Sequence, residues 1–424
     1  MNKIIRTYKK YRNNENARKI ASNFISLSSL QVVSYLFPLI TMPYLARVIG
    51  VSGFGAIAFA AAVIAYFSTI TDWGFKYTAV REISINRENQ DAISTIFSTV
   101  IASKIILMIL SAVTLWLLIK FIPFFSNYSI ILWATFTMIP GYLLFPDWLF
   151  QAMEEMKYIT IMNICSKTIF TILVFCVIKT DKDYIIEPLL QAAGYIISGG
   201  VGFYYAIKHF KLKIIVPSLK DCVVMMRRSF NMFISQFFPT LYNNLSIIIL
   251  EAVSGVKATG VFSAGFKFIN ITDSISQALS RAFYPFLARR MDKHSFYVKL
   301  SGSISIFMSL LLFLSADIII HVFYTSDFSQ AVNIIRILAC SPFFLFLMNS
   351  FGTNGLVLIG KDNILRNIVI ICSIFGLLIS LGLIYILGSY GVAIAIVTTW
   401  GIRGISSYIM YRRCSKINFN SIQS

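Results

Sequence analysis

Apolar runs of about 20 residues recur along the whole of this 424-residue chain. A helix of that length just crosses the hydrocarbon core of a bilayer. Only 13% of the residues are charged, whereas soluble domains carry about 25%. The pattern therefore predicts an all-α polytopic membrane protein and excludes a series of soluble domains.

The apolar windows predict twelve transmembrane helices. We place them at 20–44, 54–73, 95–119, 128–150, 158–178, 186–207, 229–250, 260–282, 300–322, 331–356, 364–387 and 389–411. Most Lys and Arg residues outside these spans lie in the two tails and in alternate loops. The opposite loops hold Arg47, Lys120, Lys179, Lys182 and Lys257 alone. The positive-inside rule then predicts that both termini are cytoplasmic, and it accounts for the net charge of +19 without a nucleic-acid partner.

The spans divide into two sets of six. We expect an N-terminal lobe at 1–207, a cytoplasmic linker at 208–228 and a C-terminal lobe at 229–424. Part of the linker has the pattern of a short basic amphipathic helix, suited to an anionic membrane surface. A shift that superposes Gly50 on Gly255 also superposes Gly55 on Gly260, without gaps. The halves therefore have the pattern of parallel repeats, and the glycines predict a tight reversal between spans one and two.

Polar residues form a stripe in the eighth span. At 100° per residue they lie within an arc of about 120° on one helix face: Lys267, Asn270, Asp273, Ser274, Gln277 and Arg281. Charge at membrane depth is costly unless it faces protein or water, so the stripe predicts a hydrated cavity. Spans one and seven add Gln31 and Asn243, together with prolines that bend helices.

Two further lysines, Lys104 and Lys167, lie about nine residues from a span edge, roughly 13 Å deep. Basic residues outnumber acidic ones inside the spans, which favours an anionic ligand, and phosphate suits Lys and Arg best. We therefore expect Lys104, Lys167, Lys267 and Arg281 to bind substrate, with Gln31, Asn243, Asn270 and Gln277 beside them. Asp273 is a candidate for ion coupling. The alternative for each lysine is a structural ion pair with Asp273 or with a carboxylate at a span end.

The sequence does not indicate a catalytic or metal site. Six scattered cysteines and three isolated histidines form no ligand cluster, and we expect no cofactor. Gly355, Gly360 and Lys361 imitate a phosphate loop, but Asp362 stands where a magnesium-binding Ser or Thr is required. No catalytic triad or paired carboxylates stand out at a suitable depth, so we expect a protein that is not an enzyme.

Three segments resemble a known family: SLQVVSYLFPLITMPYLARVIGVSGFG in span one, TDWGFKYTAVREIS after span two and DWLFQAMEEMKYIT after span four. They are similar to the polysaccharide-transport branch of the MATE-like exporter superfamily (multidrug, oligosaccharidyl-lipid and polysaccharide exporters, MOP). The resemblance is greatest to the O-antigen flippases of the Wzx type. It implies twelve helices in two lobes around a central cavity, in the bacterial inner membrane.

The resemblance also implies a substrate and partners. An undecaprenyl-diphosphate-linked oligosaccharide would pass from the cytoplasmic to the periplasmic leaflet by alternating access, for O-antigen and lipopolysaccharide biosynthesis. The polymerase and the chain-length regulator of the same pathway are candidate partners. The drug-exporting branch relies on acidic residues in its cation-coupled lobe, where spans one and two here offer only Asp72. This departure counts against drug export, and a cation-coupled drug or metabolite exporter is kept as the alternative.

Overall fold

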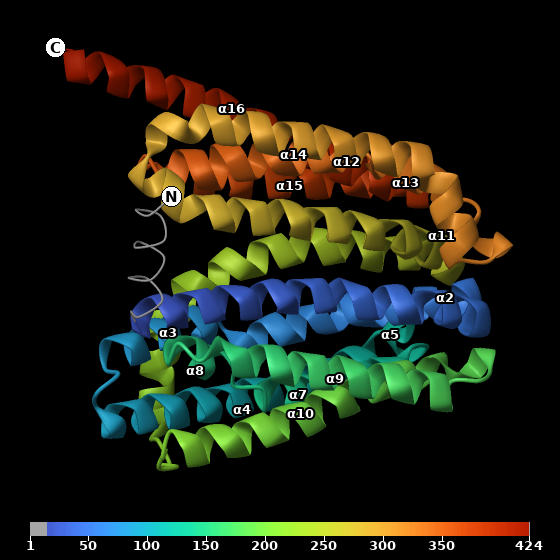
Figure 1. The fold of residues 1–424 in the computed structure, drawn as a ribbon. Coiled ribbons are helices and arrows are strands. Elements are labelled where there is room, and N and C mark those ends of the chain that lie inside the picture. The colour runs from blue at the N-terminus through green and yellow to red at the C-terminus, as the bar shows by residue number, and fades with distance from the viewer. Residues whose placement is uncertain (1–14, 424) are drawn as a thin grey trace, which may run out of the picture. The chain divides into compact units, whose positions relative to one another are not determined.

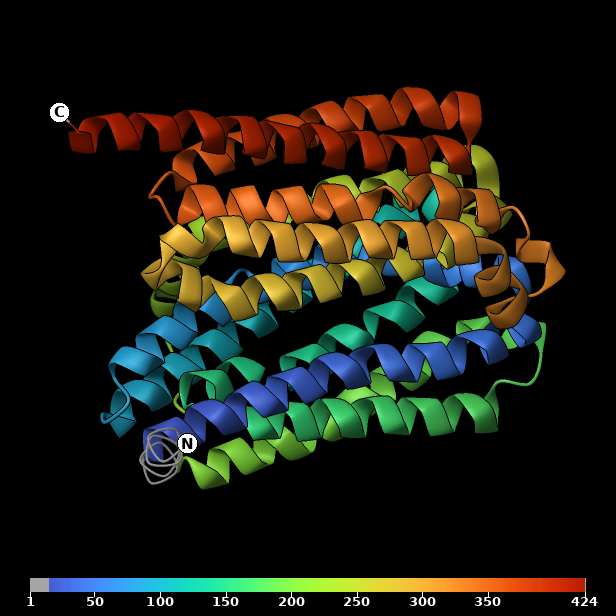
Figure 2. The same ribbon diagram turned by 45° about the horizontal axis from the view of Figure 1, so that its top comes forward.

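The computed structural model describes the backbone of residues 15–423. It describes side chains in 36–415, except those of Pro239, Leu241, Tyr242, Ala282, Pro285 and Arg289. Over this described part the chain consists of helices and their connections, with no strand, as the apolar windows predict. Neighbouring helices pack lengthwise in pairs: α9 (Met156–Val177) lies against α10 (Glu187–His209), and α15 (Asp362–Leu387) lies against α16 (Ser389–Gln423) (Figures 1 and 2).

Two exceptionally long helices contain a sharp reversal. They are α2 (Glu15–Asp72) and α11 (Leu219–Arg289). The reversal lies at Gly50 in α2, with φ 64°, and at Gly255 in α11, with φ 80°. Only glycine adopts this conformation without steric cost, so the glycines that the sequence analysis singled out make each long helix a pair of spans.

The first half of the chain combines long helices with several short ones. After α2 they run in the order α3 (Phe75–Ile85), α4 (Gln90–Phe121), α5 (Pro123–Ser126), α6 (Ser129–Phe136), α7 (Met138–Leu143), α8 (Asp147–Ala152), α9, η1 (Asp181–Ile185) and α10. Local sequence sets several of these ends. The Asn89 side chain accepts a hydrogen bond from the Ala92 N–H at 3.0 Å and caps α4. Thr180 and Asp183 form a capping box on η1.

The second half follows the same plan. After α11 come η2 (Met291–Lys293), α12 (His294–Phe323), η3 (Ser326–Phe328), α13 (Ala331–Leu338), α14 (Ser341–Leu347), the π-helical η4 (Met348–Val357), α15 and α16. Gly360, with φ 72°, ends the helix before α15, and its N–H bonds to the Val357 carbonyl at 3.0 Å.

Nine helical segments of the described chain are long and apolar enough to cross a membrane, judged by length and composition. Two of the nine, Leu36–Ile85 and Asn243–Ala288, each include a glycine reversal. The 23-residue α10 covers another predicted span but is not among the nine. Helices thus lie at all twelve predicted positions, while the nine segments do not themselves establish the number twelve.

By contacts the chain divides into two compact units. Unit 1 contains the chain up to Tyr44 together with Val63–Phe237, and unit 2 contains Leu45–Ala62 together with Phe238–Ser424. In unit 1 the core is aromatic: Phe75, Phe97, Trp148 and Phe150 are fully buried. Residues 210–218 connect α10 to α11, and the basic segment expected as a surface helix is the first part of α11 itself.

In unit 2 the two reversals pack on each other. A Cβ added to Gly55 would lie 1.9 Å from the Val256 carbonyl oxygen, and one added to Gly260 would lie 2.1 Å from the Val51 carbonyl oxygen. These positions are the ones that superpose when Gly50 is placed on Gly255. The repeat seen in the sequence is therefore a reciprocal contact in space.

Candidate functional site

The polar stripe of α11 is one continuous face, as its spacing predicts. The Gln277 amide nitrogen donates a hydrogen bond to the Asp273 carboxylate at 2.9 Å, and Arg281 donates one to the Gln277 amide oxygen at 2.9 Å. One turn earlier, the Ser274 hydroxyl donates to the Asn270 backbone carbonyl at 2.9 Å. Gln277 thus links an acid and a base that lie two turns apart. Asp273 and Gln277 are partly buried, whereas Asn270 and Arg281 are exposed.

Further cations gather on this face within unit 2. The Lys267 ammonium lies 4.0 Å from the centre of the Phe54 ring, in the arrangement of a cation–π contact. Arg403 on α16 and Arg281 both act electrostatically on the Asp273 carboxylate. Two basic side chains, Arg281 of the stripe and Arg403 of α16, therefore act on one acid, and Lys267 adds a third cation further along the same helix.

The π-helical η4 contacts α11 and was not predicted. The Asn349 amide donates to the Ser276 hydroxyl at 3.0 Å, and the Asn354 amide donates to the Ser280 carbonyl at 3.2 Å. Asn354 is fully buried, and its side-chain oxygen accepts no hydrogen bond from the described residues. π-helical turns are frequent at functional sites. The run of amides, hydroxyls and glycines at 349–355 is the sequence signal that marks this segment.

A buried histidine fixes the same segment from the other side. His294, 6% exposed, donates from Nε2 to the Ser350 carbonyl at 2.9 Å. Its Nδ1 accepts from the Tyr411 hydroxyl at 3.3 Å, and Ser301 bonds to the Ser350 hydroxyl at 3.3 Å. The π-helical backbone is therefore tied to α12 and α16 as well as to α11.

In unit 1 the predicted site lysine Lys104 makes an ion pair. Its ammonium lies 2.8 Å from the Asp72 carboxylate; the lysine side chain is 6% exposed and the aspartate 33%. This is the ion pair with a span-end carboxylate that the sequence analysis kept as the alternative, and it balances the lysine charge. Nearby, Lys76 pairs with Asp147 at 3.2 Å.

The second pair joins two of the segments that carry the family resemblance. Lys76 belongs to TDWGFKYTAVREIS and Asp147 to DWLFQAMEEMKYIT. Here α3 packs on α8, and the Ser84 hydroxyl donates to the Ala152 carbonyl at 3.4 Å. At least part of this motif is therefore structural.

The remaining predicted site residues lie apart from the stripe. Lys167 in α9 of unit 1 is partly buried and has no ion-pair partner in the described chain. Asn243 in α11 of unit 2 has a buried side-chain oxygen without a described hydrogen-bond donor. Gln31 lies in α2, and its side chain is outside the described residues. Of the predicted residues, the structure thus links Asp273, Gln277 and Arg281 by hydrogen bonds, with Lys267 and Asn270 on the same face of α11.

No group of three His, Cys, Asp or Glu side chains in the described part could hold a metal ion. The imitation of a phosphate loop also has a structural explanation. Gly355 lies in the π-helical segment, and Lys361 donates its backbone N–H to the Leu356 carbonyl at 2.8 Å where that helix ends. A phosphate loop instead follows a strand.

Comparison with known proteins decides the family. The model of a family described as polysaccharide biosynthesis protein matches residues 20–291. This chain is a member of that family. One curated relative is a putative O-antigen transporter of Escherichia coli (strain K12). It is 26% identical to this chain over 394 residues, which cover 91% of this chain and 95% of that protein. A putative O-antigen transporter of Shigella dysenteriae is 24% identical over 385 residues, covering 89% and 96%.

Solved structures share the fold of this family member. The lipid II flippase MurJ in an inward closed conformation aligns with a TM-score of 0.69 at 13% identity, covering 92% of this chain and 87% of that one. An inward-facing MATE multidrug resistance transporter of the MOP superfamily aligns with a TM-score of 0.65 at 15% identity, covering 92% and 99%. At such identities the likeness establishes the fold alone, which is that of MOP-superfamily transporters in a multi-pass membrane protein.

Proposed function

We propose that the protein is a flippase for an undecaprenyl-diphosphate-linked oligosaccharide repeat unit of O-antigen or a related surface polysaccharide. The repeat unit would pass from the cytoplasmic to the periplasmic leaflet of the bacterial inner membrane, with both termini of the protein in the cytoplasm. Family membership and the two named relatives support a role with polysaccharide. The observation that carries the substrate class is the cationic stripe of α11, because a diphosphate needs basic partners inside the membrane.

The chemistry of the stripe suggests a division of roles. Lys267 and Arg281 would bind the diphosphate, since charged donors make the strongest hydrogen bonds to phosphate. Lys167 is a further candidate, whereas the charge of Lys104 is already balanced by Asp72. The amides of Asn243, Asn270, Gln277 and Gln31 are suited to sugar hydroxyls because they both donate and accept hydrogen bonds. The protein would thus transport its ligand without a covalent step, and would not be an enzyme.

Alternating access is the mechanism that we propose for this movement. Proline in a helix interior removes a hydrogen bond and weakens the helix at one point. Pro38 and Pro43 in α2 and Pro239 in α11 lie close to where the chain passes between unit 1 and unit 2. These helices would bend as the lobes rock. The polymerase and chain-length regulator of the same glycan remain candidate partners.

The test is the leaflet location of lipid-linked repeat units in cells with and without this gene. Membrane-impermeant periodate applied to spheroplasts oxidises only sugars that face the periplasm. We expect labelled repeat units with the gene and unlabelled, cytoplasmic ones without it. Lys267→Ala should reduce surface glycan while the protein still inserts. Full activity after neutralising Lys104, Lys167 and Lys267 together would contradict the assignment of these lysines.

Asp273 favours a second candidate function, a cation-coupled drug or metabolite exporter. It is a carboxylate within a span, partly buried and hydrogen-bonded to Gln277. If repeat units are labelled equally in both strains, dye efflux becomes the assay to use. An exporter should then lose efflux in Asp273→Asn.

A further inference from the structure

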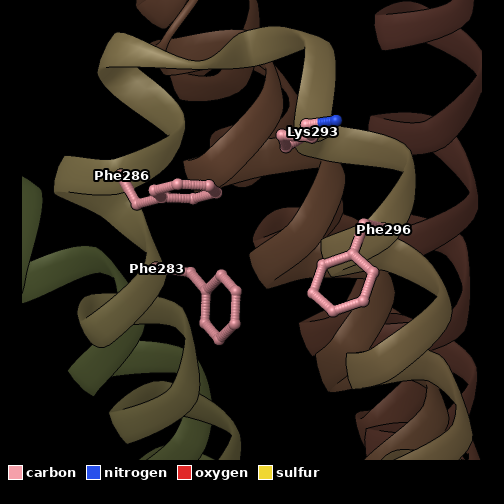
Figure 3. Close-up of a pocket in the computed structure, with 4 residues that line it drawn as sticks. All are labelled: Phe283, Phe286, Lys293 and Phe296. Atoms are coloured by element: carbon pink, nitrogen blue, oxygen red, sulfur yellow. The ribbon is translucent and has the colours of Figure 1, made fainter. Parts of the chain in front are cut away.

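A cavity of about 610 Å³ lies at the end of α11, away from the stripe. Phe283 and Phe286 project into it from α11 and Phe296 from α12, and Lys293 lies on the turn that joins the two helices (Figure 3). The volume is in the range of sites that hold small organic ligands. Phe286 and Phe296 are 41% and 59% exposed, so the cavity is open to the surroundings.

This aromatic cavity is separate from the proposed substrate site. At 100° per residue, Phe283 and Phe286 lie on average about 150° around α11 from the centre of the polar stripe. Phe283 packs instead on Tyr297 of α12, with ring centres 5.2 Å apart. A ligand in the cavity would therefore contact a face of α11 that is turned away from the centre of the polar stripe.

The cavity continues into an exposed apolar surface along α12. Leu300, Phe307, Leu310, Leu314 and Ile318 are all exposed and follow Phe296 at intervals of three, four or seven residues. Only 17% of the apolar window of this span is buried. In a membrane protein such a surface faces lipid. The aromatic cavity is thus the end of a lipid-facing stripe.

The mouth of the cavity carries excess positive charge. The Arg290 guanidinium makes two hydrogen bonds to Asp292, at 3.1 and 3.2 Å. The Lys293 ammonium is 3.8 Å from the same carboxylate, and its side chain is 51% exposed. Two cations share one acid, so Lys293 is available to an outside anion. An apolar cleft with a cation at its rim is complementary to a lipid with an anionic headgroup.

We propose that this cavity binds an anionic phospholipid of the surrounding bilayer. Its phosphate lies against Lys293, and one acyl chain lies between Phe283, Phe286 and Phe296 and continues along α12. The positive-inside rule assigns this end of α12 to the cytoplasmic leaflet. Free phosphate does not explain the aromatic walls, and a neutral lipid does not explain the cationic rim. The proposal is independent of what the protein transports.

The experiment uses the purified full-length protein and native mass spectrometry. Dioleoyl-phosphatidylglycerol is compared with dioleoyl-phosphatidylcholine, which has the same chains and no net charge. We expect phosphatidylglycerol to bind more tightly to the wild type, and Lys293→Gln to weaken it about fivefold, the effect of one lysine near an anionic surface. Lys299→Gln, which removes the same charge from a site outside the cavity, should bind as the wild type does.

A second pair of variants tests the aromatic walls. Phe296→Ala should weaken both lipids, whereas Phe313→Ala, which alters an exposed ring elsewhere on α12, should change neither. Equal binding of the two lipids by the wild type, or equal losses in Lys293→Gln and Lys299→Gln, would overturn the proposal. Displacement of phosphatidylglycerol by equimolar undecaprenyl phosphate would overturn it as well, because the occupant would then be the carrier lipid.

Discussion

Lys104 and Lys167 lie at similar depth in their predicted spans but in different surroundings. Lys104 is buried and pairs with Asp72, whereas Lys167 is partly buried and has no described ion-pair partner. Removing one partner of a buried ion pair lowers the stability of the protein strongly, because it leaves an uncompensated buried charge. Replacing a charged side chain that has no ion-pair partner causes no such loss. Breaking the Lys104–Asp72 pair should therefore lower mainly stability, whereas replacing Lys167 should lower mainly transport.

For the pair, we expect Asp72→Asn to destabilise the protein more than Lys104→Met. The first variant leaves a buried ammonium unpaired, at a cost of about 3 kcal/mol, while the second leaves a carboxylate that is one-third exposed. The double variant should recover much of this loss. Thermal unfolding of the purified protein in detergent measures all three. Equal losses in the single variants, with no recovery in the double variant, would contradict an ion pair that acts mainly through structure.

For Lys167 we expect little change in stability and a loss of transport. Lys167→Met breaks no described ion pair, so the free energy of unfolding should change by less than about 1 kcal/mol. Surface glycan should nevertheless fall if this cation attracts the diphosphate. Lys182→Met, in the exposed η1, serves as the matched loss of charge. Normal glycan in Lys167→Met cells would remove this residue from the proposed site.

For single residues, the sequence predicts which side chains share one face of a helix, because helical periodicity determines this. The stripe from Lys267 to Arg281 follows from the spacing of residues on one helix, and hydrogen bonds at i and i+4 join its members Asp273, Gln277 and Arg281. The partner of Lys104 could be narrowed only to Asp273 or a span-end carboxylate. Asp72 lies 32 residues away in sequence, at the end of α2, so the pairing depends on the fold and not on the spacing along one helix.

Among the elements, the π-helical η4 is the feature that spacing rules miss. Its wider turns direct Asn349 and Asn354 toward Ser276 and Ser280 of α11, which an uninterrupted α-helix of the same length would not do. The apolar window identified the span at 331–356 but contained no information on the hydrogen-bond pattern within it. The spacing of apolar residues predicts that a helix is present. It does not predict whether the helix is α- or π-helical, which depends on tertiary contacts.

Deleting Thr353 should convert this segment to α-helix and rotate the following residues by about 100°. Asn354 would then lose Ser280, and we expect surface glycan to be lost. Thr353→Ala keeps the length of the segment and alters only an exposed side chain, so it should transport normally. Tag fluorescence after size-exclusion chromatography verifies that both variants are inserted and folded. Normal glycan from the deletion variant would show that the π-helical winding is dispensable.

For the whole molecule, the order of spans along the chain and the grouping of spans in space differ. Counting spans divides the chain at 208–228, whereas contacts place Leu45–Ala62 with Phe238–Ser424. The reason is the close approach at Gly55 and Gly260, which packs one reversal on the other. The glycine pattern predicted a tight reversal between spans one and two and superposed Gly255 and Gly260 on the same positions, but it did not indicate that the two reversals meet.

Alanine at either glycine should separate these helices. In Gly55→Ala the new methyl group would meet the Val256 carbonyl oxygen, and in Gly260→Ala that of Val51. Overpacking of this kind costs about 1–3 kcal/mol, measured as a lower midpoint of thermal unfolding. Gly382→Ala in α15 has nothing within 4 Å of its Cβ and should be neutral or stabilising. A similar loss in Gly382→Ala would mean that the contact is not the cause.

The contact at Gly55 and Gly260 is also symmetric. When residue i of one copy touches residue j of the other, and j touches i, the arrangement is that of a two-fold symmetric homodimer. Here both partners lie in one chain, so Gly55 and Gly260 occupy equivalent places in a contact with local two-fold symmetry. Once alanine at one glycine has forced the helices apart, alanine at the other should cost less, and the double variant should be less damaging than the two losses combined.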